Sequence, residues 1–346
     1  MIGRDDIAVV TVNWNGWRNT LACLDALRAS IGVRWHLFVV DNGSTDGSLD
    51  HLGGLGDNVT LIDAGSNRGW TGGNNLGLMR ALDQGYHYAL ILNNDACVEP
   101  DTLAVLLRTA VAWPAAAMPP VLGPIHRGVH RSLGAADYDF VAAVIDPKTG
   151  IPAWVPPSEL GSALSRPLTA TAYISGAGIF AQRVHFESVG FFDDRFYLNF
   201  DDTDWCMRVS RAGFPLIMVR DASINHIGSA SIGGRQSPLQ IYFLTRNRML
   251  FAEKHWGWRE SLRILRRYIW QARDLANDGT RGSWPGKFLR SRAGQMAAFR
   301  QGLIDYALRR FGDCPPQIRR WQANGATNPA APATRASLGP VTDGEQ

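Results

Sequence analysis

The first 110 residues alternate short apolar runs with amphipathic stretches of helical spacing. Apolar, β-branched runs open the segments 7–14 (IAVVTVNW), 36–44, 58–82 and 88–110, and each run predicts a buried strand. Leucines recur at helical spacing over 17–30, and the last parts of 58–82 and 88–110 also predict helices. Strands that alternate with helices indicate an α/β fold with a parallel, helix-flanked sheet.

The second half of the chain has a less regular pattern. Residues 114–168 are rich in Pro, Gly and Ala, and we expect an irregular insertion there, with a short hairpin near 138–155. The segment 171–190 predicts a buried stretch that runs into a helix, and 215–231 predicts a strand and a loop. We therefore expect a first domain over 1–237, a basic helical extension over 238–322, and a disordered tail over 323–346.

Charge is distributed unevenly between these parts. Residues 241–322 hold 17 Lys and Arg against 6 Asp and Glu, and five of the 12 tryptophans. Such a segment fits an anionic partner, either membrane headgroups or nucleic acid, or is simply a solvated helical face. Because no RRM, KH or helix-turn-helix signature accompanies the charge, we expect no nucleic-acid partner.

Other features of the sequence bear on location. The four cysteines lie far apart without a CxxC pair, which favours a reducing compartment. The N-terminus has no signal-peptide pattern, and no apolar run is long enough to span a bilayer. We expect a cytoplasmic protein, with residues 241–322 able to hold it at the inner face of the cytoplasmic membrane.

Polar residues gather where the predicted strands end. They are Thr11 and Asn13, Asp41, the 67–75 loop, and Asn93 to Asp95. The carboxyl ends of parallel strands meet at one edge of a sheet, so these groups can converge on one cleft. Asp95 suits a hard divalent cation and Asp41 suits a base N–H, but each also fits an ordinary Asx turn.

Two further segments add candidate chemistry. Glycines 69, 72, 73 and 77 precede or enter a helix and allow close approach of an anionic nucleotide, although the pattern is neither GxGxxG nor a P-loop. His226 follows a strand among small polar residues, which suits a metal ligand, a phosphate donor or a structural histidine.

An acidic cluster, Asp201-Asp202-Thr203-Asp204, lies among Phe, Tyr and Trp residues. Neighbouring carboxylates and apolar surroundings raise carboxylate pKa values, which suits a general base that works near neutral pH. The cluster also fits the start of a helix, where Asp is favourable, and Asp204 with Arg208 forms an i,i+4 pair.

Taken together and in this order, the motifs resemble those of the family 2 glycosyltransferases with the GT-A fold, especially the bacterial rhamnosyltransferase-like branch. The resemblance covers about residues 7–255 and implies a Rossmann-like mixed sheet flanked by helices, with a C-terminal helical extension. The matching segments are VTVNWNG, VVDNGSTDGS, NRGWTGGNNLG, LILNNDACVEP, the stretch from SGAGIF to RAGF followed by INHIGSAS, and YFLTRNRMLFAEKH at 242–255.

This resemblance implies roles for individual residues. The family's DxD motif appears as Asn93-Asn94-Asp95, with an amide in place of the first carboxylate, which implies Asp95 as a ligand of Mg²⁺ or Mn²⁺ and His226 as a second ligand. The resemblance also implies a nucleotide site at the ends of the first strands and in the Asn-Arg-Gly loop. Its residues are Thr11, Asn13, Asp41, Asn67, Arg68, Gly69, Asn74, Asn93 and Asn94.

The family's Glu-Asp motif, which lies near the acceptor, falls on the acidic cluster. It implies Asp202 as the general base, with Asp201 the second choice, and it places Asp201, Asp204 and Trp205 on the acceptor side. Asp201 replaces a Glu and is one methylene shorter.

We therefore predict an inverting, metal-dependent glycosyltransferase that moves a sugar from a nucleoside diphosphate donor to a hydroxyl of a glycan or polyprenol-linked acceptor, in cell-surface polysaccharide synthesis. The donor we expect first is dTDP-rhamnose. The alternatives are a UDP-hexose donor, a nucleotidyltransferase, and a non-catalytic binding protein. A nucleotidyltransferase is expected to carry a Gly-rich, basic N-terminal loop, which VTVNWNGW does not provide.

Overall fold

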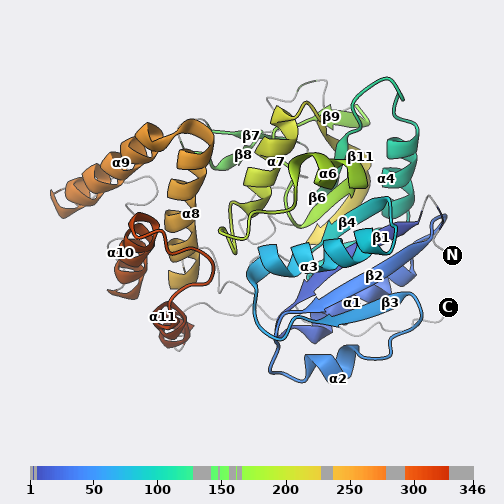
Figure 1. Ribbon diagram of the computed structural model, residues 1–346, viewed down its shortest axis with the longest axis horizontal. Coiled ribbons are helices and arrows are strands. Elements are labelled where there is room, and N and C mark those ends of the chain that lie inside the picture. Colours follow the sequence, from blue (N-terminus) through green and yellow to red (C-terminus); the bar gives the residue numbers. More distant parts are fainter. Residues whose placement is uncertain are drawn as a thin grey trace, which may run out of the picture.

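The computed structural model describes residues 3, 6–127, 142–146, 149–155, 161, 166–226, 237–277 and 293–326. Its main sheet has the strand order β3-β2-β1-β4-β10-β6-β11-β5, with β9 paired to β11 (Figure 1). The strands are β1 (Ile7–Asn13), β2 (Trp35–Asp41), β3 (Val59–Asp63), β4 (Tyr88–Leu92), β5 (Ala96–Val98), β6 (Val121–Arg127), β9 (Leu168–Ala170), β10 (Gly178–Gln182) and β11 (Leu216–His226).

The first half of the sheet is parallel, as its sequence pattern predicts. β1 lies between β2 and β4, and β2 pairs with β3, all in the same direction. Helices cover these strands, and two apolar cores fill the opposite faces of the sheet. The helices of this half are α1 (Trp17–Arg28), α2 (Ser48–Leu52), α3 (Gly69–Asp83) and α4 (Thr102–Val111).

The second half makes the sheet mixed. β10 runs antiparallel to both β4 and β6, whereas β6 and β11 are parallel to each other. β5 and β9 each pair antiparallel with β11. The helices α6 (Arg183–Val189) and α7 (Asp201–Arg211) belong to this half. The expected mixed sheet flanked by helices is confirmed.

The structure differs from the expectation of an irregular segment over 114–168. Val121–Arg127 forms β6, a buried strand inside the main sheet. Gly123 and Pro124 lower the strand propensity of this segment, because both residues are depleted in sheets. A short antiparallel pair, β7 (Ala143–Ile145) and β8 (Pro152–Trp154), lies within the range of the expected hairpin. Residues 128–141 lie outside the described residues.

The expected C-terminal helical extension is present, as α8 (Pro238–Trp256), α9 (Trp258–Asn277), α10 (Ala293–Ala307) and α11 (Pro316–Ala326). Figure 1 shows these helices grouped at the end of the molecule away from β1, β2 and β3. α11 continues past the expected boundary at residue 323, and the tail beyond Ala326 lies outside the described residues. Within the described part of the chain, no helix has both the length and the apolar character needed to cross a membrane.

The extension packs on the segment that precedes α7. One apolar cluster joins Tyr197 to residues of α8 and α10, and a second joins Phe196 and Phe200 to Leu250 and Phe251 of α8. α8 therefore lies against the acidic cluster that the sequence singles out.

Candidate active site

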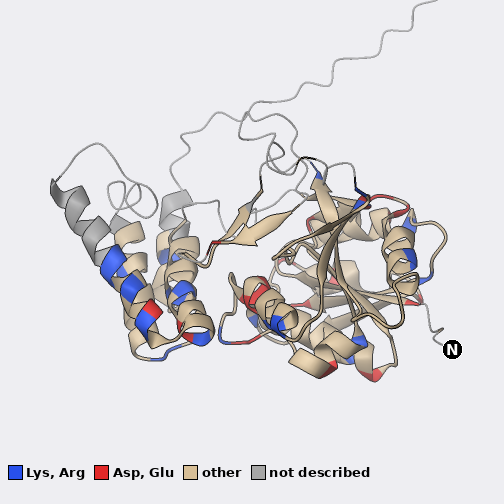
Figure 2. Ribbon diagram, turned by 90° about the horizontal axis from the view of Figure 1, so that it is seen from above, with Lys and Arg blue, Asp and Glu red and all other residues tan. Residues whose placement is uncertain are grey.

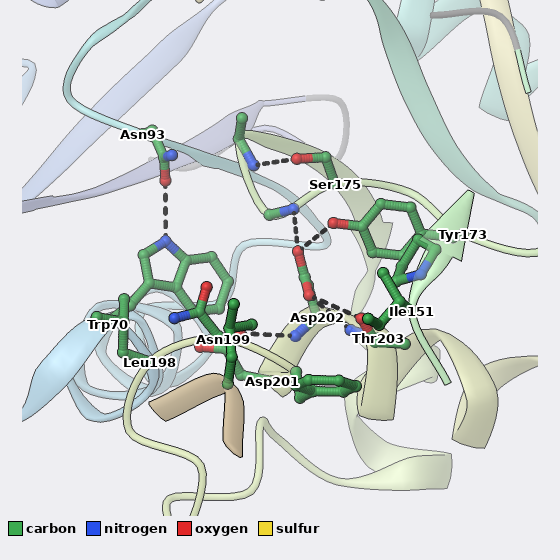
Figure 3. A pocket seen from close by; sticks show the side chains of 15 residues that line it. Trp70, Asn93, Ile151, Tyr173, Ser175, Leu198, Asn199, Asp201, Asp202 and Thr203 are labelled. Atoms are coloured by element: carbon green, nitrogen blue, oxygen red, sulfur yellow. Dashed lines mark hydrogen bonds between the residues drawn. The ribbon is translucent and has the colours of Figure 1, made fainter. Parts of the chain in front are cut away.

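Two adjoining cavities lie at the carboxyl ends of the central strands. The first, here the Asp95 cavity, contains Asp95 and His226 among its lining residues. The second, here the Asp202 cavity, is lined by Asp201 and Asp202 (Figure 3). Trp70, Asn93 and Leu198 line both cavities, so these three residues form the boundary between them.

Asp95 and His226 meet because two short strands pair. Asp95 follows β4 directly before β5, and β5 pairs with the end of β11, where His226 lies opposite Ala96. The Nε2 of His226 is 3.1 Å from Oδ1 of Asp95. Asn93 places its Nδ2 at 3.3 Å from the same histidine nitrogen. The structure therefore brings together the two residues that the resemblance implies as metal ligands.

A second histidine lies behind this pair. His126 on β6 is buried, and its ring stands edge-on to the ring of His226 at a centroid distance of 6.0 Å. Burial, and then the neighbouring His226, lower the pKa of His126 to about 3, so its imidazole stays neutral. The sequence analysis missed His126 because it treated this stretch as irregular.

The chemistry of Asp95 and His226 fits a divalent cation. Asp95 offers a carboxylate oxygen and His226 an imidazole nitrogen, and Mn²⁺ accepts both kinds of ligand. Within the described residues no group of three or more His, Cys, Asp or Glu side chains is assembled for a metal. Two protein ligands leave coordination positions for water and phosphate oxygens, as is usual for a cation that binds together with a phosphorylated substrate.

Asn67 and Gly69 form another part of the Asp95 cavity, where the loop before α3 meets Tyr197. Oδ1 of Asn67 accepts hydrogen bonds from the Gly69 backbone at 2.8 Å and from the Tyr197 hydroxyl at 2.9 Å. Gly69 has a φ of +71°, and a Cβ atom there would lie 2.3 Å from the Tyr197 carbonyl oxygen. Only glycine therefore fits this position.

Trp70 separates the two cavities and orients Asn93. Its indole Nε1 donates to Oδ1 of Asn93 at 2.8 Å (Figure 3). This bond fixes the amide so that its nitrogen faces His226. The amide that replaces the first carboxylate of the DxD motif thus serves as a link between Trp70 and His226. Trp70 stands inside the NRGWTGGNNLG motif, but the sequence gives it no role.

Asp202 is held in place by four donors at the start of α7. Its Oδ2 accepts from the Tyr173 hydroxyl at 2.6 Å and from the Gly176 backbone at 2.9 Å. Its Oδ1 accepts from the backbone and the hydroxyl of Thr203, at 2.7 and 3.2 Å. Tyr173 and Gly176 come from the segment before β10, which the sequence analysis did not connect with the site. The carboxylate is half-buried and faces the cavity.

Asp201 has a different environment although it also lines the cavity. It is only 4% exposed, and its Oδ2 accepts from the Thr71 hydroxyl at 3.0 Å. Burial, and then the charge of Asp202, raise the pKa of Asp201 to about 7. The sequence analysis expects the raised pKa at the base, Asp202, whereas the structure gives it to the neighbouring Asp201.

Asp204 and Trp205 do not reach either cavity. Burial opposes ionisation of Asp204, but a bond from His255 and the charges of Arg208 and Lys254 outweigh it and lower its pKa. The expected Asp204–Arg208 pair is present at 2.9 Å, and Lys254 on α8 approaches Asp204 at 2.7 Å. Trp205 is fully buried in the core beneath α7. Both residues anchor α7 rather than line the site.

Several predicted nucleotide residues also support the cleft without lining it. Asp41 is fully buried, with Oδ1 accepting from Asn13 at 2.8 Å and Oδ2 from the Ser44 backbone at 2.9 Å. Among the predicted nucleotide residues, those that line the Asp95 cavity are Asn67, Gly69, Asn93 and Asn94; those that line neither cavity are Thr11, Asn13, Asp41, Arg68 and Asn74.

The mixed sheet, with polar groups at the ends of its central strands, has the GT-A fold. A solved structure of GalNAc-T7 with UDP, GalNAc and Mn²⁺ is similar to this chain, with a TM-score of 0.58 and 14% sequence identity. The match covers 88% of this chain and 56% of that chain, so this chain spans little more than half of that structure. The likeness establishes the fold.

Residues 8–135 match the family model "Glycosyl transferase family 2", and the chain therefore carries a family 2 glycosyltransferase domain. An N-acetylglucosaminyl-diphospho-decaprenol L-rhamnosyltransferase of Mycobacterium tuberculosis (strain ATCC 25618 / H37Rv) is 26% identical over 278 residues, which cover 73% of this chain and 86% of that protein. The dTDP-rhamnosyl transferase RfbF of Shigella flexneri is 23% identical over 227 residues, which cover 64% of this chain and 71% of that protein. The resemblance expected from the motifs is confirmed.

Proposed function

We propose that the protein transfers a sugar, with inversion at the anomeric carbon, from a nucleoside diphosphate donor to a hydroxyl of a glycan or polyprenol-linked acceptor. One observation carries this proposal: the cavity with Asp95 and His226 adjoins the cavity with Asp202 across Trp70, Asn93 and Leu198. A donor diphosphate in the first cavity and an acceptor hydroxyl in the second would meet at this boundary.

In this proposal Asp202 is the general base. Its carboxylate takes the proton of the acceptor hydroxyl while that oxygen attacks the anomeric carbon and the bond to the diphosphate oxygen breaks. The bonds from Tyr173 and Gly176 hold the carboxylate in one orientation. Asp201, with its raised pKa, carries a proton during part of the time near pH 7 and so limits the charge repulsion beside Asp202.

Asp95 and His226 would hold Mg²⁺ or Mn²⁺ next to the diphosphate. When bound, the cation would offset the negative charge of the departing nucleoside diphosphate. Asn93 keeps its amide beside His226 through its bond from Trp70. The likeness to a structure that contains Mn²⁺ and UDP supports this part of the proposal.

The donor we propose first is dTDP-rhamnose, and the acceptor is a polyprenol-linked glycan in cell-surface polysaccharide synthesis. The names of the two relatives support both choices, since one names a decaprenol-linked acceptor and both name rhamnosyl transfer. A UDP-hexose is the alternative donor.

We further propose that α9 rests on an anionic membrane surface at the inner face of the cytoplasmic membrane. Ser261 and Ile264 are buried, whereas Trp258 is 62% and Leu262 41% exposed. Figure 2 shows Lys and Arg, in blue, along the described part of this helix. Basic side chains flank these exposed apolar residues, which is the pattern of an interfacial helix. The exposed arginines are Arg259, Arg263, Arg266 and Arg267.

Vesicle flotation tests this contact. The full chain should float with phosphatidylglycerol vesicles but not with phosphatidylcholine vesicles, and the double change Arg266→Glu and Arg267→Glu should abolish flotation. Arg80→Glu, an exposed arginine on α3, is the matched control and should float like the unchanged protein. Equal flotation of all three proteins would contradict the proposal.

A donor screen tests the reaction itself. The purified chain is incubated with dTDP-rhamnose, UDP-glucose, UDP-galactose, UDP-N-acetylglucosamine or GDP-mannose, with Mg²⁺, Mn²⁺ or EDTA, and release of the nucleoside diphosphate is measured. We expect release from dTDP-rhamnose with metal and none with EDTA. Release only from a UDP-hexose would support the alternative donor, and no release from any donor, with or without a polyprenol-linked acceptor, would refute the proposed function.

A further inference from the structure

We propose that Arg319, on the last helix of the C-terminal extension, binds the diphosphate of the donor in the Asp95 cavity. This inference rests on the proposed function and adds a residue that lies far outside the matched family 2 domain. It assigns the extension a direct part in donor binding, separate from any membrane contact of α9.

The fold brings α11 back to the beginning of the chain. Arg319 lines the Asp95 cavity together with Trp14, which directly follows β1. The guanidinium carbon lies 5.4 Å from the centroid of the Trp14 ring, within the range of a cation–π contact. Leu239 and Phe243 of α8 line the same cavity. The extension therefore supplies one wall of the cavity that holds Asp95 and His226.

Two hydrogen bonds set the position of the Arg319 side chain. Its Nη2 donates to the Tyr197 hydroxyl at 3.2 Å and to Oδ1 of Asp313 at 2.7 Å. Tyr197 in turn donates to Oδ1 of Asn67 at 2.9 Å. Within the described part of the chain, Nε and Nη1 have no hydrogen-bond partner. The guanidinium is thus fixed at one nitrogen and keeps further N–H donors for a bound molecule.

The charge of this residue fits what the cavity must hold. Among the described residues that line the cavity, Arg319 is the one lysine or arginine, and Asp95 belongs to the same lining. A leaving nucleoside diphosphate gains negative charge as the sugar bond breaks, and a fixed cation stabilises that charge. Arginine is also the side chain whose planar donors match phosphate oxygens.

A purely structural role for Arg319 makes different predictions. Its bond to Asp313 would then only tie α11 to the turn before it, and loss of either partner would lower thermal stability alike. Asp313→Asn removes that tie but leaves the Arg319 charge in place, so the two roles are separable.

Binding of dTDP and of UDP, in the presence of Mn²⁺, is measured by calorimetry on the full chain. For whichever nucleotide the unchanged protein binds more tightly, Arg319→Gln should weaken binding about tenfold or more, as expected for loss of a charge-assisted phosphate contact. Arg319→Lys should bind with an affinity between those of the unchanged protein and Arg319→Gln, because the positive charge remains but the planar donors are lost. Arg320→Gln, an exposed arginine on the same helix, should bind like the unchanged protein.

Thermal unfolding without nucleotide is recorded for the same variants. The inference is upheld if Arg319→Gln loses affinity while Asp313→Asn keeps it within about threefold. It is overturned if Arg319→Gln binds as tightly as the unchanged protein, or if Arg319→Gln and Asp313→Asn lose affinity equally. If the unchanged protein binds neither dTDP nor UDP, the proposed function fails and this inference fails with it.

Discussion

The side-chain amide of Asn247, on α8, donates a hydrogen bond of 2.7 Å to the carbonyl oxygen of Leu198 beside the acidic cluster. The same Nδ2 lies 2.7 Å from the carbonyl oxygen of Phe196 and 2.9 Å from that of Asn199. The loop that it holds is unusual, because Tyr197, Asn199 and Phe200 all have positive φ values, between 64° and 69°. Non-glycine residues in this region store strain that surrounding structure must offset. α8 therefore holds the loop that leads into Asp201 and Asp202.

Replacement of Asn247 tests this dependence. Asn247→Ala removes all three contacts and takes this donor from the carbonyl groups of Leu198 and Asn199, whereas the Phe196 carbonyl keeps its bond from Arg246, so the free energy of unfolding should fall by about 2–3 kcal/mol. The rate of sugar transfer should fall more than the stability loss explains, because the relaxed loop misplaces Asp202. Urea denaturation and initial rates measure the two effects.

The control for this change is Asn58→Ala, which removes an exposed asparagine in the turn before β3. It should leave both quantities unchanged. Normal activity of folded Asn247→Ala would show that the loop keeps its shape without α8.

Removal of single carboxylates separates their roles in the acidic cluster. Asp202→Asn should reduce kcat by about 10²–10⁴-fold, the usual contribution of a general base, while the affinity for the nucleoside diphosphate is retained. Asp201→Asn should reduce kcat less, because Asp201 tunes the charge beside the base. Steady-state kinetics with a saturating donor compare the two variants.

Asp204→Asn serves as the comparison within the same helix. It breaks a buried ionic network with Lys254 and Arg208, so it should lower thermal stability strongly. A larger loss of kcat in Asp201→Asn than in Asp202→Asn would transfer the role of base to Asp201.

The raised pKa of Asp201 predicts a pH dependence of stability. In the folded state this carboxyl keeps its proton up to about pH 7, whereas the ordinary value is 3.8. Between these values the native state binds a proton that the unfolded state releases, so rising pH lowers the free energy of unfolding by at most about 1.4 kcal/mol per pH unit. The contribution is fully present below about pH 4 and is lost as the pH passes through 7.

The variant Asp201→Asn has no carboxyl group at this position. The other titratable groups are the same in both proteins, so their effects on stability cancel in the comparison. The stability of the unchanged protein relative to Asp201→Asn should therefore fall between pH 4.5 and pH 7 and level off above. Urea midpoints at pH 4.5, 6, 7 and 8 give the difference. A difference that stays constant with pH would argue against a raised pKa at Asp201.

Gly69 offers a test of the contact between the Asn-Arg-Gly loop and Tyr197. Gly69→Ala should destabilise the fold and weaken nucleotide binding, because its Cβ would meet the Tyr197 carbonyl oxygen. Gly65→Ala is a matched control: Gly65 has a φ of +70° but nothing within 4 Å of an added Cβ. It carries only the strain of a left-handed backbone, about 1 kcal/mol.

The difference between these two alanine variants isolates the clash from the backbone strain. Thermal unfolding and calorimetric binding of dTDP measure it. Equal behaviour of Gly69→Ala and Gly65→Ala would show that the loop moves away from Tyr197 without loss.

Local patterns in the sequence predict the parallel half of the sheet well and place Asp95 at its edge, whereas only the family resemblance pairs His226 with Asp95. Apolar runs and turn residues are local signals, and strand ends of a parallel sheet must lie at one edge. The sequence analysis missed β6 because Gly123 and Pro124 have low strand propensity. Burial of the strand between β10 and β11 outweighs this low propensity.

The site residues that the sequence analysis missed are those fixed by long-range packing. Tyr173 reaches Asp202 from the segment before β10, and Arg319 reaches Trp14 from α11. Neither placement follows from residue spacing. In the same way, the family motifs imply Asp41 and Asn13 as nucleotide ligands. In the structure their side chains hydrogen-bond to each other, and both residues are fully buried.

The contacts of α8 and α11 with the 196–200 loop also determine at what stage of protein synthesis this loop can take its shape. Asn247 follows Phe196 by 51 residues, and Arg319 follows Tyr197 by 122. The ribosome delivers the loop before either of these residues, while the strands of the family 2 domain are already free to fold. The 196–200 loop therefore gains its contacts with Asn247 and Arg319 only after the two helices have emerged.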